Sequence, residues 1–259
     1  LNPLSADIAV LRNSMLYGML EAVNYNINRK SEDLKLYEFG RTYHKQASGN
    51  FAFTERKTLA LLVTGKKHQP SHHAKNEDAN FYTLKAFTES ILSRLGIDSS
   101  SSAIEHTSLN ASLQYGSGKK SLACLGMVKP ALLKNFDIGQ NVYYAEFYLD
   151  DMYKQAFSPV IYSEPAKFPT VKRDLALLLD KAVTYAQLEK VAFEAERKLL
   201  KEVSLFDVYE GDKIPAGKKS YALSFTLLSP EATLTDKQIE GSMEKLLKAF
   251  EKEFSASLR

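Results

Sequence analysis

The sequence has 259 residues, of which 44% are hydrophobic and 25% are charged, so it can form folded cores and is unlike a disordered protein. This length exceeds the usual size of one domain and favours two compact units. The net charge of +3 neither demands nor excludes a polyanionic partner. Composition excludes a collagen-like chain, and the absence of a long apolar run predicts no membrane span.

The cysteine content indicates the compartment. A single cysteine, Cys124, cannot form an internal disulfide, which is typical of proteins in a reducing cytosol. We therefore expect a cytoplasmic protein. The first residues contain no initiator Met and no signal-like apolar segment, so we expect a piece of a longer chain.

Residues 1–153 are predicted to form an antiparallel α+β domain, because helical and strand-like periodicities alternate along them. Ser14 is available as N-cap of the first helix, and Gly96 is placed to stop the second. The expected elements are a helix over 16–27, strands over 34–43 and 57–65, a helix over 81–95, a hairpin of 113–115 and 122–125 around Gly116-Ser117-Gly118, a short helix over 130–136 and a strand over 142–149.

Residues 154–165 are predicted to be a linker, because two prolines and polar residues interrupt the periodic segments. Residues 166–259 are predicted to form a ferredoxin-like βαββαβ domain. Two capping boxes support its helices: Thr184 with Gln187, and Thr235 with Gln238. The expected order is a strand over 171–180, a helix over 184–200, strands over 203–210 and 219–228, a helix over 235–254 and a short strand over 257–259. Both helices are expected on one sheet face, which leaves the other face free to bind.

Four sequence features are not assigned a chemical function. The stretches 116–121 and 217–220 resemble phosphate-binding loops but lack the first Gly and the Ser or Thr after Lys that such loops require. The histidines His68, His72 and His73 lie in a polar segment without a compatible set of further zinc ligands, which favours a solvated loop. Cys124 lies among apolar residues and is interpreted as a small buried side chain.

The predicted sheet of the second domain carries aromatic residues, with cations close to its strand ends. Stacking rings and phosphate-binding cations are what a platform for single-stranded RNA needs. Strand alternation, however, places some of these rings in the core, so a plain packed sheet is the alternative. The residues concerned are Phe206, Tyr209, Tyr221, Phe225, Lys218, Lys219 and Arg173.

The order of short motifs along nearly the whole chain resembles the C-terminal part of the β subunit of bacterial phenylalanyl-tRNA synthetases. In the first domain the matching stretches are 2–5, Leu11-Arg12 with Ser14, Leu16 and Gly18, 28–29, 37–40, 80–85 and 125–130. In the second domain they are 168–169, 173–176, 206–209, 218–220, 233–236 and Leu258-Arg259. The resemblance implies a class II synthetase-like antiparallel sheet domain without catalytic activity, followed by a ferredoxin-fold anticodon-binding domain.

The first domain departs from the catalytic relatives at both ATP-binding places. Where they carry Gly-Arg-x-Tyr-Arg, this chain has Gly40-Arg41-Thr42-Tyr43-His44, so an imidazole replaces a guanidinium that would contact phosphate. Bulky and acidic residues over 144–151 occupy the region of the second ATP-binding Arg. We expect no catalytic residue, metal or cofactor in this chain. The resemblance implies ATP and Mg²⁺ in an α2β2 holoenzyme.

The resemblance also implies roles in binding the anticodon stem-loop of tRNA-Phe. Tyr209 is expected to stack on an anticodon base, and Ser220 to hydrogen-bond a base edge. Phe206 is part of the same expected site, and Lys218, Lys219 and Arg173 would hold phosphates. For Arg173 a salt bridge with Asp174 is an equal alternative. Ala232 replaces an Arg found in many relatives, so the loop before Thr233 is not assigned a phosphate contact.

The sequence therefore predicts a non-catalytic part of phenylalanine-tRNA ligase, with a scaffold domain that docks the catalytic α subunit and a domain that binds tRNA-Phe. Two alternatives stay open at this point. One is an active ATP-dependent class II ligase domain, and the other is an interaction module that binds no RNA.

Overall fold

The computed structural model describes residues 10–45, 53–69, 71–73, 75–117, 120–156, 162, 164–212 and 214–259. The chain forms two compact units, Leu1–Ile161 and Tyr162–Arg259, and each is described by itself. The division lies within the expected linker over 154–165. Part of that segment, 157–161 and 163, is outside the described residues, as is Gly118 of the expected hairpin turn.

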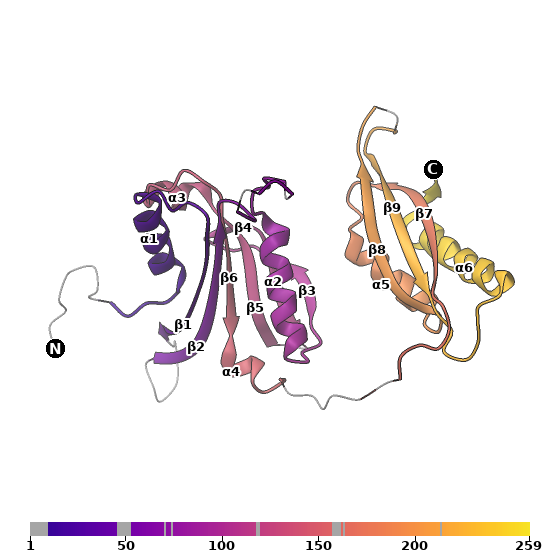
Figure 1. Cartoon of the computed structure of the whole chain (residues 1–259), viewed down its shortest axis with the longest axis horizontal. Helices are drawn as coiled ribbons and strands as arrows, with labels where there is room; N and C mark the ends of the chain where they lie inside the picture. The colour runs from indigo at the N-terminus through magenta and orange to yellow at the C-terminus, as the bar shows by residue number, and fades with distance from the viewer. Residues whose placement is uncertain are drawn as a thin grey trace. The chain divides into compact units, whose positions relative to one another are not determined.

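The first unit is built on a six-stranded antiparallel sheet in the order β1-β2-β6-β5-β4-β3 (Figure 1). Its strands are β1 Leu34–Lys45, β2 Phe53–Thr64, β3 Ser100–Ala103, β4 Leu109–Ser117, β5 Lys120–Val128 and β6 Val142–Tyr148. Its helices are α1 Leu16–Ile27, α2 Phe81–Arg94, α3 Pro130–Asn135 and α4 Leu149–Met152.

Both faces of this sheet are packed. Alternation along β2 directs Leu59 and Val63 into a core shared with α2, and Ala60 and Leu62 into a core shared with α1. The sheet is therefore the middle layer of the unit, and its buried strands read as continuous apolar runs.

The first unit confirms most of the predicted elements. Asn80 caps α2 in a capping box with Thr83, and Gly96 follows α2 with a φ of 66°, the left-handed conformation that ends many helices. The prediction for Ser14 was wrong by one position: Met15 is the N-cap of α1, although the Ser14 hydroxyl accepts a hydrogen bond from the Leu16 N–H. Two elements were missed, β3 and α4.

The second unit has a four-stranded antiparallel sheet in the order β10-β7-β9-β8. Its elements are β7 Val171–Asp180, α5 Tyr185–Ala195, β8 Leu200–Tyr209, β9 Lys218–Leu227, α6 Asp236–Phe254 and β10 Ser257–Leu258. This is the predicted βαββαβ order, and both predicted capping boxes are present. The two helices lie on the same side of the sheet (Figure 1), over a core that includes Phe225 and Phe250.

The predicted helix over 184–200 was too long. Helix α5 ends at Ala195 because Glu196 leaves helical geometry and its carboxylate accepts the N–H groups of Lys198 and Leu199. The same carboxylate also binds Ser242 and Lys245 of α6. These contacts turn the chain so that β8 begins three residues earlier than predicted.

No helix among the described residues has the length and apolar character needed to cross a bilayer.

Candidate nucleic-acid interface

The four-stranded sheet has one face that the helices leave uncovered. On β9, Tyr221, Leu223, Phe225 and Leu227 are buried in the core beneath α5 and α6, so the alternate residues point to the opposite side. We call that side the open face. Its residues are Lys172, Asp174, Ala176, Leu178 and Asp180 of β7, Lys218, Ser220, Ala222, Ser224 and Thr226 of β9, Glu202, Ser204, Asp207 and Tyr209 of β8, and Ser257 of β10 with Arg259 after it.

Tyr209 and Ser220, two of the predicted site residues, lie together on the open face. They are direct cross-strand partners, so their side chains leave the sheet on the same side. Ser220 is only 3% exposed, yet its hydroxyl has no hydrogen-bond partner among the described residues. A partly exposed phenol ring thus borders a hydroxyl that is free to donate or accept.

Of the other predicted residues, Lys218 lies at the same end of this face, and Phe206 lies at an irregularity of β8 next to Asp207. Lys218 pairs across the sheet with Asp180 and forms no ion pair within the described part of the chain. Phe206 is 61% exposed and stands at an irregularity of β8, between Leu205 and Asp207, where the register shifts. The bulge explains how a large ring can sit exposed beside a core strand.

The structure separates Lys219 and Arg173 from this group. Lys219 shares the helix-covered side with Tyr221, is 7% exposed, and donates to the Tyr221 hydroxyl over 2.7 Å. Arg173 pairs with the buried Phe225, so it also leaves the sheet on the helix side, where it is exposed and donates to its neighbour's carbonyl. The alternative salt bridge between Arg173 and Asp174 does not form among the described residues.

Sequence reasoning missed two residues of the open face. Asp207 pairs with Ala222, and the Arg259 guanidinium lies over the Tyr209 ring, 4.8 Å from its centroid. Strand alternation in 257–259 could have placed Arg259, because it puts Ala256 and Leu258 on one side and Arg259 on the other. Nothing in the local sequence indicated that a residue so distant in the chain reaches Tyr209.

Charges of both signs alternate over the open face. Its cations are Lys172, Lys218 and Arg259, and its carboxylates are Asp174, Asp180, Glu202 and Asp207. Such a balance provides local contacts rather than a strong field, so phosphate binding here would depend on individual side chains.

In the first unit, the stretch that corresponds to an ATP-binding motif is engaged within the protein. Arg41 forms an exposed ion pair with Glu55 over 2.6 Å, and the His44 ring hydrogen-bonds the buried Thr42 hydroxyl. At Gly40, an added Cβ would overlap the side chains of Arg12 and Met15, so these two side chains pack directly on the strand. No space is left over β1 at this point.

The second expected ATP-binding region is filled by large side chains of β6. Tyr144 is buried and donates to the Glu146 carboxylate over 3.0 Å. Burial raises the pKa of Glu146, although hydrogen bonds and the nearby Arg56 act against this shift. The Arg56 guanidinium lies over the Tyr148 ring. These residues do not fit a triphosphate, since a carboxyl and two rings occupy the place where cations would be needed.

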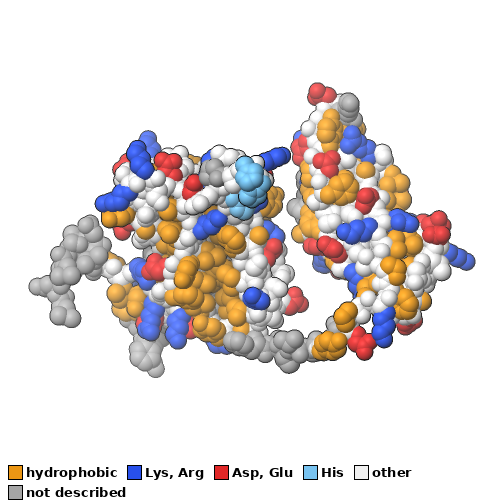
Figure 2. Space-filling view, in the orientation of Figure 1, with side chains coloured by type: hydrophobic (Ala, Val, Ile, Leu, Met, Phe, Trp, Pro, Cys, Tyr) orange, Lys and Arg blue, Asp and Glu red, His pale blue; other side chains and the backbone are white. Residues whose placement is uncertain are grey.

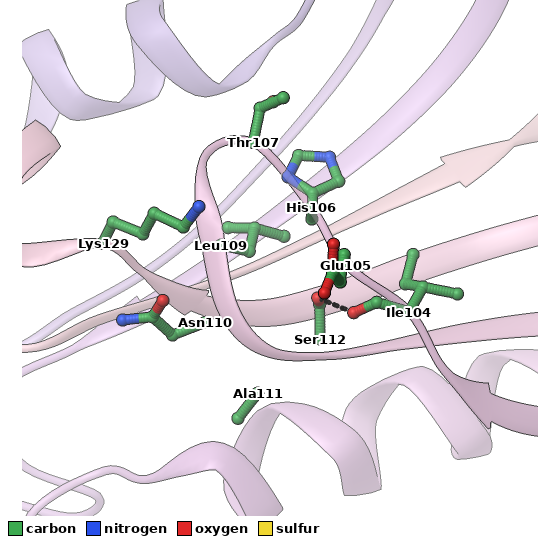
Figure 3. Close-up of a pocket in the computed structure, with 9 residues that line it drawn as sticks. All are labelled: Ile104, Glu105, His106, Thr107, Leu109, Asn110, Ala111, Ser112 and Lys129. Carbon is green, nitrogen blue, oxygen red and sulfur yellow. Dashed lines mark hydrogen bonds between the residues drawn. The ribbon is translucent and has the colours of Figure 1, made fainter.

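A pocket of about 590 Å³ lies elsewhere in the first unit, around the loop between β3 and β4 (Figure 3). Burial, with the neighbouring Lys129, lowers the pKa of His106 in its wall. Ser112 donates to the Ile104 carbonyl over 2.7 Å and closes one side. The pocket contains none of the predicted site residues. Within the described part of the chain, no three potential metal ligands gather.

The first unit also exposes aromatic side chains beside α2. Tyr37 and Phe39 of the edge strand β1 are 71% and 63% exposed, and they point to the α2 side because they pair with Leu61 and Leu59. Tyr82 and Phe87 of α2 are exposed as well. We call Tyr37, Phe39, Tyr82 and Phe87 the aromatic patch. Figure 2 shows hydrophobic side chains gathered on this face of the unit.

Comparison with known proteins gives two family matches. Residues 1–149 match the phenylalanyl tRNA synthetase beta chain CLM domain, and residues 166–259 match the ferredoxin-fold anticodon binding domain. A weak similarity to a solved pyrrolysyl-tRNA synthetase from Desulfitobacterium hafniense, at 17% identity over 55% of this chain and 48% of that chain, has a TM-score of 0.43 and carries no argument.

Curated relatives are similar over the whole chain. The protein named phenylalanine–tRNA ligase beta subunit in Bacteroides fragilis is 46% identical to this chain, and the match covers 100% of this chain and 33% of the relative. The protein of the same name in Bacillus subtilis is 34% identical, and the match covers 99% of this chain and 32% of the relative. The protein of that name in Thermotoga maritima is 30% identical, and the match covers 100% of this chain and 32% of the relative. The chain therefore spans about a third of the length of these relatives.

Proposed function

Because the chain belongs to the phenylalanyl-tRNA synthetase β-chain family, we propose that its second unit binds the anticodon stem-loop of tRNA-Phe on the open face. The observation that carries the proposal is the adjacency of the Tyr209 ring and the Ser220 hydroxyl, which has no hydrogen-bond partner among the residues that the structure describes. An exposed base needs a ring to stack on and a polar group at its edge, and this pair offers both.

Four residues have a chemical role in this proposal. Tyr209 stacks on an anticodon base, and Ser220 donates to or accepts from that base's edge. Lys218, which forms no ion pair with another described residue, contacts a backbone phosphate, and Phe206 at the bulge offers a second apolar ring. Lys219 and Arg173 can contribute only where RNA passes around the edge of the sheet, because both leave it on the helix side.

The first unit serves as a scaffold without adenylate chemistry in this proposal. Of its two candidate phosphate-binding places, one holds Arg41 in an ion pair with Glu55 and the other holds the hydrogen-bonded Tyr144 and Glu146, which does not favour a triphosphate. In the whole enzyme, ATP and Mg²⁺ would be used by a catalytic α subunit in an α2β2 assembly in the cytoplasm. The ligation of phenylalanine to its tRNA is then a property of that assembly.

The aromatic patch is the surface that we assign to the α subunit. β1 is a twelve-residue edge strand, and an exposed edge with aromatic side chains is avoided in proteins that stay alone. The relatives are named β subunits, which implies an α partner for them. The alternative is that a segment from the rest of the β subunit covers the aromatic patch.

The anticodon proposal is tested by the affinity of the 259-residue chain for an anticodon stem-loop hairpin of tRNA-Phe, measured by fluorescence anisotropy at two salt concentrations. A hairpin with the same stem and a permuted loop is the control RNA. Tyr209→Ala should weaken binding by about 1 to 3 kcal/mol, whereas Tyr209→Phe keeps the stacking ring and most of the affinity. Equal affinity for both hairpins would contradict the proposal.

The two rival functions have their own signatures. An interaction module without RNA binding would show no measurable affinity for the hairpin at low salt. An active ligase domain would form phenylalanyl adenylate, so phenylalanine-dependent ATP–pyrophosphate exchange by this chain alone would overturn the scaffold assignment.

A further inference from the structure

Arg259 is fixed at the edge of the open face by the backbone. Its N–H donates to the Ala176 carbonyl over 2.9 Å, which continues the pairing of β10 with β7 by one residue. Ala256 is buried in the core beneath the helices, so alternation directs Arg259 to the open face. The side chain therefore starts on the same side of the sheet as Tyr209.

A path of small residues leads from Arg259 toward β8. Continued register places Arg259 beside Ala176, Ala176 pairs with Ala222, and Ala222 pairs with Asp207. Two methyl groups in this row leave room for a long side chain to lie across two strands. The guanidinium reaches the Tyr209 ring, where its carbon is 4.8 Å from the ring centroid, within the range of a cation–π contact.

The hydroxyl end of the Tyr209 ring is held by a second contact. An added Cβ at Gly211 would lie 2.7 Å from the Tyr209 Oη and 3.0 Å from its Cζ, so the ring tip packs directly against the glycine backbone. Gly211 and Arg259 thus confine the ring from two directions. The guanidinium lies over one face of the ring, so a ligand that stacks on Tyr209 would use the opposite face.

The guanidinium of Arg259 keeps its hydrogen-bonding capacity. Among the described residues it forms no ion pair and no side-chain hydrogen bond. A guanidinium has five N–H donors, and stacking on a ring leaves their in-plane directions open. An anion beside the Tyr209 ring would meet these donors.

We propose that Arg259 is a further RNA-binding residue of the open face: it positions the Tyr209 ring by stacking and offers its free N–H groups to a phosphate next to the stacked base. This inference rests on the proposed anticodon function. It assigns a role to the pairing of β10 with β7, which brings a cation from one edge of the sheet to an aromatic ring on the other.

The test compares Arg259→Ala, Arg259→Lys and the control Arg197→Ala in the 259-residue chain. Arg197 is an exposed arginine beyond the end of α5 and away from the open face, so its removal changes the net charge equally. With the anticodon stem-loop hairpin as probe, Arg259→Ala should lower affinity roughly tenfold and Arg197→Ala less than twofold. Arg259→Lys should recover only part of the loss, because an ammonium lacks the planar face.

Two readouts separate positioning from a general structural effect. The combined loss in the Tyr209→Ala, Arg259→Ala double variant should be smaller than the product of the single losses, since each removes the same stacked pair. The slope of log affinity against log salt should fall by about 0.7 for the phosphate contact, while the thermal unfolding midpoint stays unchanged.

The outcomes distinguish this inference from the function on which it rests. If the unmodified chain fails to bind the hairpin, the anticodon function itself is wrong. If the chain binds and Arg259→Ala behaves as Arg197→Ala, or binds more tightly because an obstructing side chain is gone, the role of Arg259 is overturned and the anticodon function stands.

Discussion

The side chains of Tyr209 and Ser220 lie opposite each other on β8 and β9, on the sheet face that carries no helix. Ser220 pairs on its other side with Leu178, and its hydroxyl has no partner within the described part of the chain. Because the Ser220 hydroxyl makes no hydrogen bond within the described protein, we expect it to contribute little to the free energy of folding. A ring and a hydroxyl side by side suit a nucleotide base, so we expect the pair to contribute to the free energy of RNA binding.

Ser220→Ala should therefore weaken hairpin binding without changing stability. The loss of one hydrogen bond to a base edge predicts about 0.5 to 1.5 kcal/mol in affinity. Because the hydroxyl has no partner within the described protein, the free energy of unfolding should stay the same. Ser224→Ala is the matched control, since Ser224 lies on the same face two pairs away, opposite Asp174 and Ser204. Equal effects of the two substitutions would exclude a specific role for Ser220.

The aromatic patch predicts a partner-dependent phenotype. Tyr37→Ser combined with Phe39→Ser should reduce co-purification with the α subunit by at least severalfold, because exposed rings at an interface core carry much of the binding energy. Tyr25→Ser is the control, an exposed tyrosine on α1 whose ring is covered by Arg29. If the double variant co-purifies normally with the α subunit, the patch does not bind that subunit and another segment, such as the rest of the β subunit, covers it.

The core of the second unit should be sensitive to loss of an aromatic ring. Phe225 is fully buried with its ring centroid 6.0 Å from that of Phe250, so Phe225→Ala should cost about 3 to 5 kcal/mol in unfolding free energy. Phe206→Ala, at an exposed ring of the same sheet, should change stability by about 0.5 kcal/mol or less. Urea denaturation followed by circular dichroism measures the free energy of unfolding of both variants. Similar losses for the two would contradict the assignment of Phe225 to the core and of Phe206 to the surface.

Cys124 provides a probe of the first unit. Burial raises the pKa of its thiol to about 11, with a smaller opposing effect of the Tyr148 hydroxyl. Because the folded state holds the proton, the contribution to stability is present below the unfolded pKa and is lost as pH rises toward 11. At pH 8 the native chain should react with a thiol reagent far more slowly than the urea-unfolded chain. Rapid reaction of the native chain would show that the thiol is accessible.

The sequence was sufficient for the elements whose signals are local. Capping boxes at Thr184 and Thr235 and the stop at Gly96 are written in neighbouring residues, and the structure confirms them. The end of α5 was not predictable in the same way, because the carboxylate of Glu196 is held by Ser242 and Lys245 from a distant helix. β3 was missed because its four residues, Ser100–Ala103, show no alternation of apolar and polar side chains. They form a strand because they pair with β4.

The candidate site shows the same limit. Alternation separates Ser220 from Lys219, although the family resemblance implied that both residues contact RNA. Which face each residue occupies depends on where the helices pack, and the Arg259 contact depends on strand order across the sheet. These are tertiary properties that no local motif expresses.

The most direct test follows the alanine methyl signals of the 259-residue chain by NMR during titration with the anticodon stem-loop hairpin of tRNA-Phe. Ala176 and Ala222 lie on the open face, whereas Ala192 of α5 is buried in the core between the helices and the sheet. Binding on the open face predicts shifts at Ala176 and Ala222 and none at Ala192. Shifts confined to Ala192, or to alanines of the first unit, would contradict the assignment of this face to RNA.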